Sequence, residues 1–455
     1  MWGLAAILWL AGGGALAASE RPAPDPKAGQ AAYGRSCARC HGAAGKGDGV
    51  DAKRFYPRPR DLTLGVYKFR STASGTPPTD EDLFQTIHRG LPGTNMPDWQ
   101  QLDEATRWRL VDYLKSLSPV FEHTPPSPVT MPPDPGAKRA DLEKGQAVYQ
   151  QLGCAACHGA SGRANGMSAA GLVDDWGMPI RPADFTQGWT FRGGAAPRDI
   201  ALRLITGIDG AGMPSYAEAV SGEDIWHLAY YVASLQEPPA WHMIAHPLRV
   251  SGSLPASLDD PRWGQAERTD LRLRNVVQPA GEWAHPPTVR AIRMQAVYNE
   301  DTIAFRLTWD DPTQEAAESP APDALALVLK PADTQGDVVT LQAWPYAGAP
   351  RLDLCYWSAA GVSGETLAAE FDGVRSAPRW PATRTAASSY DDGRWQVLLQ
   401  RPLQPQAPEG AAAITAGAFT SIAFAVWDGG NADARAVSPW VELSLRDPTR
   451  PSGGH

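Results

Sequence analysis

The chain has 455 residues, and 41 Lys and Arg against 50 Asp and Glu leave a formal net charge of −9 at pH 7. This acidic balance, without basic runs, argues against nucleic acid as the main partner, because phosphate binding relies on clustered Lys and Arg. Only 5 residues are Cys, too few for a scaffold held together by disulfides. The length predicts about three domains.

Residues 1–17 form an uncharged apolar run that ends in Ala15-Leu16-Ala17, which is typical of a cleaved secretory signal peptide. An uncleaved anchor is the alternative, but the run is short for a membrane span and Gly12-Gly13-Gly14 interrupts its helix. No later segment approaches the ~18 consecutive apolar residues of a span. We therefore expect a periplasmic protein whose mature chain has no integral membrane span.

Two segments, residues 27–117 and 144–235, are copies of one unit. Cys37-Ala38-Arg39-Cys40-His41 in the first copy corresponds to Cys154-Ala155-Ala156-Cys157-His158 in the second. Self-similarity of this length indicates two domains with the same fold.

Each copy ends in the apolar spacing of a helix, at Trp108–Leu117 and Trp226–Leu235. We therefore predict two all-α domains, at residues 22–118 and 137–237. The proline-rich segment between them, residues 119–136, is expected to be an extended linker rather than a helix.

The motif Cys-x-x-Cys-His is the attachment signature of c-type haem. Its two thiols bond to the haem vinyl groups, and its His is an axial ligand of the iron. A redox dithiol or half of a zinc site is the alternative for Cys-x-x-Cys alone, but the His follows in both copies and no further zinc ligands are evident. We predict two covalently bound haem c groups, held by Cys37, Cys40 and His41 and by Cys154, Cys157 and His158.

Met96 and Met213 each follow their motif His by 55 residues, although the spacing inside the two copies differs. A single Met is usually a core residue, but this repetition favours Met96 and Met213 as the sixth ligands of the two irons. Iron with His and Met as axial ligands has a raised reduction potential and no free coordination position. This pair of ligands therefore indicates electron transfer rather than catalysis.

Three other basic residues are candidates for contact with haem. Arg70 and Arg192 both follow Phe at matching positions of the repeat, and either could pair with haem propionates or lie on the surface. His88 is close to Met96 in sequence, but its counterpart in the second copy is Ile205, so we do not expect it to bind iron.

After residue 237 the helical spacing gives way to short strand-like runs separated by turn residues. This pattern predicts an all-β sandwich over residues 245–447, followed by a tail at 448–455. The clearest runs are Val289–Val297, Ile303–Trp309, Leu325–Leu329, Trp395–Leu399 and Ser421–Val426. The whole chain is thus expected to be multidomain, with two all-α domains and a C-terminal all-β domain.

On these motifs, residues 25–118 and 140–237 each resemble a class I cytochrome c domain. The β region resembles the haem-binding gamma-subunit domain of the ethylbenzene dehydrogenase and dimethylsulfide dehydrogenase family. The similar stretches are Leu258–Trp263, Ile303–Asp311, Asp323–Leu327, Leu354–Trp357 and Ile422–Gly429. This resemblance implies a β-sandwich that docks onto a molybdenum catalytic subunit and an iron–sulfur subunit.

In that family the domain holds a haem b between a Met and a Lys. Here the stretch expected to contain the Met reads Pro345-Tyr346-Ala347-Gly348, and Arg435 stands where the Lys is expected. Arginine has no lone pair to offer to iron. We therefore do not expect haem b in the C-terminal domain. Cys355, the Cys outside the two motifs, lies in an aromatic strand pattern and is expected to be buried and unreactive.

The sequence favours an exported dihaem cytochrome c that serves as electron-transfer subunit or partner of a periplasmic oxidoreductase, such as a molybdoenzyme of the dimethyl sulfoxide reductase family. One alternative is a dihaem enzyme, peroxidase-like or thiosulfate-oxidising, which needs an open iron. Another is a pair of cytochromes anchored by a β module that binds carbohydrate or a cell surface. Exposed Trp residues in a row would favour that module, whereas burial of Trp309, Trp357, Trp427 and Trp440 would favour an ordinary core.

Overall fold

The computed structural model describes residues 21–275, 288–316, 318–331, 352–361, 363–368, 384–404, 412–431 and 435–445. The expected signal peptide at 1–17, the tail at 448–455 and the stretch Pro345–Gly348 lie outside the described residues. In the described ranges no helix is long and apolar enough to cross a membrane.

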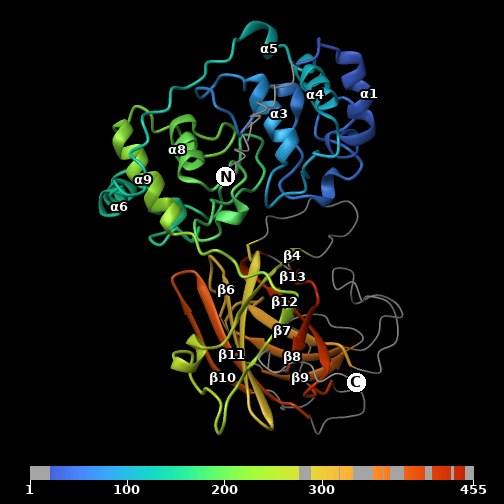
Figure 1. The fold of residues 1–455 in the computed structure, drawn as a ribbon, viewed down its shortest axis with the longest axis vertical. Helices are drawn as coiled ribbons and strands as arrows, with labels where there is room; N and C mark the ends of the chain where they lie inside the picture. The colour runs from blue at the N-terminus through green and yellow to red at the C-terminus, as the bar shows by residue number, and fades with distance from the viewer. Residues whose placement is uncertain are drawn as a thin grey trace, which may run out of the picture.

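Two helical groups lie side by side at one end of the molecule, and a β region forms the other end (Figure 1). The two groups contain the same helices in the same order. The first group consists of α1 (Pro26–Ser36), α2 (Ala38–His41), α3 (Asp80–Arg89) and α4 (Glu104–Ser116). The second consists of α6 (Leu142–Gln151), α7 (Ala155–His158), α8 (Pro197–Thr206) and α9 (Gly222–Ser234).

The last helix of each group begins four residues before the expected Trp, because an N-cap residue lies further upstream. Asp103 accepts a hydrogen bond from the backbone N–H of Thr106 at the start of α4, at 2.8 Å. Ser221 does the same for Asp224 in α9, at 3.1 Å. Such caps satisfy N–H groups that have no partner within the helix.

The first and last helices of each group cross at a glycine. A Cβ atom on Gly29 of α1 would lie 2.0 Å from the carbonyl oxygen of Arg109 in α4. A Cβ on Gly145 of α6 would lie 2.3 Å from the carbonyl oxygen of His227 in α9. Glycine therefore lets both helix pairs approach to backbone contact.

The segment between the two groups differs from a purely extended linker. One helical turn, α5 (Val120–His123), follows Pro119, because the prolines that exclude a helix lie before and after this turn. Beyond this turn the linker contacts both helical groups. The N–H of Val129 donates to the carbonyl of Ser71 in the first group at 2.9 Å. The carbonyl of Pro132 accepts from Nε1 of Trp226 in the second group at 2.9 Å.

The β region contains two sheets that share one hydrophobic core. The first sheet has the order β1-β14-β12-β7-β8-β9, with β13 beside β12 and β4 beside β13. The second has the order β10-β11-β6-β5-β2, with β3 beside β5. Phe305, Leu327 and Phe424, from both sheets, lie in that core with 0% of their surface exposed.

The first sheet is built from β1 (Ile244–Ala245), β4 (Arg274–Asn275), β7 (Ala324–Leu329), β8 (Leu352–Ser358), β9 (Ser363–Ala368), β12 (Phe419–Trp427), β13 (Arg435–Val437) and β14 (Val441–Ser444). The second is built from β2 (Leu248–Arg249), β3 (Arg268–Arg272), β5 (Ala291–Tyr298), β6 (Thr302–Asp310), β10 (Arg384–Asp391) and β11 (Arg394–Pro402). All five strand-like runs of the sequence therefore form strands.

The four tryptophans singled out in the sequence are largely covered by the β region. Trp309, Trp357 and Trp427 are 1%, 3% and 7% exposed, and Trp440 is half-buried. Trp309, Trp357 and Trp395 pack against one another with ring centroids 5.0 to 6.3 Å apart. These rings form core packing rather than an exposed platform for a sugar. Cys355 is also fully buried, as expected, with Arg401 beside its sulfur.

Charged residues join the second helical group to the β region. Glu237, just after α9, forms ion pairs with Arg293 at 2.7 Å and with Arg394 at 3.1 Å. Arg163 pairs with Asp392 at 2.8 Å. We call these five residues the ionic joint.

Candidate haem sites

Both Cys-x-x-Cys-His motifs sit on a short helical turn that follows the first helix of its group. The N–H of His41 donates to the carbonyl of Cys37 at 2.9 Å, and the N–H of His158 donates to the carbonyl of Cys154 at the same distance. The turn ends at Gly42 and Gly159, whose φ angles are +80° and +81°. Only glycine adopts this conformation readily, so the chain turns away directly after the His.

The two His rings have matching partners. Nδ1 of His41 lies 3.0 Å from the carbonyl oxygen of Arg60, and Nδ1 of His158 lies 2.9 Å from that of Ala183. A carbonyl can only accept, so Nδ1 carries the proton and Nε2 keeps its lone pair. Burial lowers the pKa of both His residues, which favours the neutral ring. A neutral imidazole with a free Nε2 is what iron ligation requires.

The first cysteine of each motif is unsuited to thiol–disulfide exchange. Burial raises the pKa of Cys37 to about 12 and that of Cys154 to about 11. Redox dithiols work through a thiolate with a lowered pKa, so these values argue against the dithiol alternative. The described residues also bring no group of three His, Cys, Asp or Glu ligands together at either motif, which argues against the zinc alternative.

Met96 and Met213 lie on the loops that follow α3 and α8. The carbonyl of Met96 accepts a hydrogen bond from the N–H of Leu91 at 3.0 Å, and that of Met213 accepts from Ile208 at 2.9 Å. Each bond closes the loop around its Met. Both side chains are half-buried and line the same cavity as the motif residues.

That cavity, of about 540 Å³, brings the eight predicted site residues together. Its wall contains Cys37, Cys40, His41, Met96, Cys154, Cys157, His158 and Met213. The β region contributes to the wall as well, through Thr288, Arg290, Asp310 and Pro312. His88 is not among the lining residues and instead stacks on Phe84, with ring centroids 6.2 Å apart.

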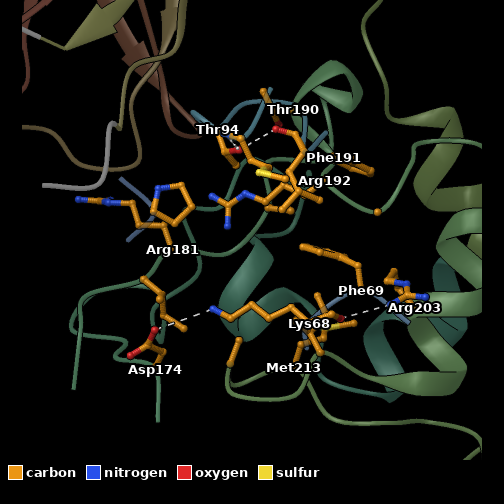
Figure 2. Close-up of a pocket in the computed structure, with 18 of the residues that line it drawn as sticks. Lys68, Phe69, Thr94, Asp174, Arg181, Thr190, Phe191, Arg192, Arg203 and Met213 are labelled. Atoms are coloured by element: carbon orange, nitrogen blue, oxygen red, sulfur yellow. Dashed lines mark hydrogen bonds and ion pairs between the residues drawn. The ribbon is translucent and has the colours of Figure 1, made fainter. Parts of the chain in front are cut away.

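The cavity wall is strongly cationic in a chain that is acidic overall. Among the described lining residues are nine Lys and Arg and four Asp. The pKa of Arg192 is lowered to about 10, mainly by burial and secondly by neighbouring Arg290. The pKa of Lys68 is lowered to about 8, mainly by burial and secondly by Arg60. Figure 2 shows Arg192 and Lys68 extending into the cavity, where the nearest acid of Lys68 is Asp174 at 3.9 Å.

The two matching arginines of the repeat have different surroundings. Arg192 lines the cavity and can reach an anionic group there. Arg70 is 1% exposed and pairs with Asp209 of the second helical group at 2.8 Å, while also donating to the carbonyl of Thr206 at 3.1 Å. Arg70 therefore joins the two helical groups and is not a surface residue.

Several residues of the site were not found from the sequence. The carbonyl groups of Arg60 and Ala183 orient the His rings, and the matched Arg58-Pro59 and Arg181-Pro182 stretches immediately before them were the available signal. Arg290 had no such signal, because it comes from the β region and has no counterpart in a repeat.

Residues 24–114 and 140–232 match the family described as Cytochrome C oxidase, cbb3-type, subunit III. The chain is 28% identical over 195 residues to the chlorate reductase subunit gamma of Ideonella dechloratans, covering 42% of this chain and 79% of that protein. It is 27% identical over 168 residues to a Haloferax mediterranei protein whose name describes a respiratory nitrate reductase haem subunit. That match covers 35% of this chain and 58% of the relative, less than two thirds of its length.

Among solved structures, a chain of the Kuenenia stuttgartiensis reducing HAO-like protein complex is 42% identical, with a TM-score of 0.45. The match covers 48% of this chain and 100% of that one. The family match lies within the two helical groups, and both relatives are named as subunits of reductase complexes, so the comparisons support an electron-carrying cytochrome c with covalently bound haem c.

Proposed function

We propose that this protein is an exported dihaem cytochrome c, the electron-transfer subunit or partner of a periplasmic oxidoreductase. The observation that carries the proposal is that both Cys-x-x-Cys-His motifs and both repeated Met residues line the same cavity. Haem with His and Met as axial ligands exchanges one electron and has no open coordination position. His41 and Met96 would hold one iron, and His158 and Met213 the other.

The wall of the cavity fits this cofactor. Buried cations without counter-charges are costly, and the nine Lys and Arg of the wall exceed its four Asp. Each haem carries a pair of propionates, which would supply the missing negative charge. Arg192 from the second helical group and Arg290 from the β region are the residues we assign to them. In this arrangement the β region, which needs no haem of its own, contributes to the electrostatics of the haem sites.

The partner is proposed to be a molybdoenzyme of the dimethyl sulfoxide reductase family with an iron–sulfur subunit. Two relatives are named as subunits of chlorate and nitrate reductases, which supports a role in a reductase complex. Residues 245–447, which we propose form a β-sandwich, resemble the gamma-subunit domain of the ethylbenzene dehydrogenase and dimethylsulfide dehydrogenase family. In that family the domain docks onto a molybdenum subunit and an iron–sulfur subunit, so we expect both kinds of partner here. The buried tryptophans weigh against the alternative of a carbohydrate-binding module.

Spectroscopy of the purified haem-loaded protein tests the ligands. A pyridine haemochrome assay should count two haem c and no haem b per chain. The oxidised protein should have the far-red charge-transfer band of Met–iron ligation, which should weaken in Met96→Ala and in Met213→Ala. Met167→Ala is the matched control, because Met167 is 99% exposed and should leave the band unchanged. Rapid cyanide binding by the native protein would contradict the proposal and favour a dihaem enzyme.

The partner is tested separately, by purification from the native source. A stoichiometric complex that contains molybdenum and iron–sulfur clusters is the expected result. A complex with a catalytic subunit that lacks molybdenum would keep the electron-transfer role and reject the molybdoenzyme.

A further inference from the structure

Three buried carboxylates meet at the end of the β region that faces the haem cavity, and none of the three is itself among the residues that line it. Asp311 directly follows β6, Asp323 directly precedes β7, and Asp428 directly follows β12. They are 0%, 0% and 3% exposed, and one oxygen atom from each lies within 4.8 Å of the others. Strands of two different sheets thus deliver three acidic groups to the same point.

Apart from the electrostatic influence of Arg181 on Asp428, the neighbours of this acidic cluster do not neutralise it. Neutral donors reach Asp323: the N–H of Glu315, Nε1 of Trp395 and the N–H of Gly429, each at 2.9 Å. Within the described ranges no Lys or Arg forms an ion pair with any of the three carboxylates. Burying several carboxylates without a cation is costly.

Asp311 points to a missing ligand. Its Oδ1 accepts a hydrogen bond from the N–H of Thr313 at 3.2 Å, but its buried Oδ2 receives none. Glu315 adds a fourth acidic group, since its backbone N–H bonds to Asp323 and its carboxylate acts electrostatically on Asp311 and Asp323. A buried oxygen without a donor, among other acidic oxygens, indicates a bound cation rather than further hydrogen bonds.

We propose that Asp311, Asp323 and Asp428 form a calcium-binding site. The ligand atoms are carboxylate oxygens, which suit hard cations and not zinc or copper. Calcium fits better than magnesium, because magnesium usually keeps several water ligands and the cluster is almost completely buried. The ion would tie β6 of one sheet to β7 and β12 of the other.

The position of the site suggests what the ion does. Asp310, next to Asp311, pairs with Arg394 of the ionic joint at 2.6 Å. It also accepts a hydrogen bond from Gln187 of the second helical group at 3.2 Å. Calcium would therefore stabilise the edge of the β region on which that helical group rests, as a structural rather than a redox-active ion.

The test uses the full, haem-loaded chain. Elemental analysis after dialysis should find one calcium per chain, and thermal unfolding should be compared in millimolar CaCl2 and in excess EGTA. An ion present at about 100 times its Kd should raise the Tm of a domain of this size by roughly 5–10 °C. The shift should disappear in Asp311→Asn, which keeps the side-chain shape and removes the charge.

The control is Asp310→Asn, which loses the pair with Arg394 but should keep the calcium-dependent shift. If the Asp311 variant does not fold, the calcium content and Tm shift of the native chain decide by themselves. Equal Tm values in CaCl2 and EGTA without bound calcium would overturn the proposal. A higher Tm of Asp311→Asn in EGTA and CaCl2 alike would also overturn it and show that the carboxylates share protons instead. Neither result depends on the number or ligands of the haems.

Discussion

Asp209→Asn should weaken the contact that holds the two helical groups together. Asp209 pairs with Arg70 at 2.8 Å and also accepts hydrogen bonds from Ser74 Oγ at 2.7 Å and from the N–H of Gly75 at 2.9 Å. The Arg70 side chain is 0% exposed and that of Asp209 is 18% exposed. The substitution therefore leaves a buried guanidinium without its counter-charge.

Removing one partner of a buried ion pair costs about 3–5 kcal/mol. The partial exposure of Asp209 places the expected loss at the lower end, about 3 kcal/mol, which corresponds to a Tm decrease of roughly 6–12 °C. Circular dichroism at increasing temperature, on the haem-loaded chain, measures this decrease. The double variant Arg70→Met/Asp209→Asn should recover part of it, since no charge then remains buried.

The matched control is Asp51→Asn. It breaks an ion pair of the same length, 2.8 Å, between Asp51 and Arg39, whose side chain is 74% exposed. Exposed pairs are screened by water and salt, so no measurable change is expected. If Asp209→Asn were as harmless as Asp51→Asn, or if the double variant showed no coupling, burial of Arg70 would not govern the strength of this contact.

Two further predictions concern the helical groups. Gly29→Ala should destabilise the protein by about 1–3 kcal/mol, because its methyl group would overlap the carbonyl of Arg109, whereas Gly34→Ala in the same helix has open space and should stabilise it. The pKa of Asp184 is raised to about 7, mainly by burial and secondly by the charge of Asp310. The Asp184 carboxyl of the folded protein therefore keeps a proton that it loses near pH 4 in the unfolded chain. Stability should fall by about 2–4 kcal/mol as pH rises from about 4 to 7, and urea unfolding of Asp184→Asn at both pH values should show a smaller fall.

The sequence was sufficient to locate the last helix of each helical group, the five main strands and the eight residues that line one cavity. These features depend on local spacing: two copies of Cys-x-x-Cys-His, a Met at a matched distance, and alternating apolar residues in Ile303–Trp309. Each of these patterns can be recognised from spacing along the chain alone. The helical spacing located the C-terminal ends of α4 and α9, whereas the caps at Asp103 and Ser221 set their starts.

The remaining features depend on contacts between distant parts of the chain. Arg70 and Arg192 occupy the same position in the repeat, yet one pairs with Asp209 and the other lines the cavity. Arg290 reaches the cavity from the β region. Asp311, Asp323 and Asp428 meet only because the ends of β6 and β12 and the start of β7 lie together. No local pattern encodes which neighbour a side chain will meet after folding.

The ionic joint has a consequence for the response of the molecule to salt. Glu237, Arg163, Arg293 and Arg394 connect the helical and β parts while their side chains remain 16–29% exposed. Partly exposed charges lose part of their attraction once the Debye length shrinks to a few ångströms, whereas kosmotropic salts strengthen apolar cores. High ionic strength would thus loosen the connection between two parts that each stay folded, and the distance between Arg290 and the haem sites would become adjustable.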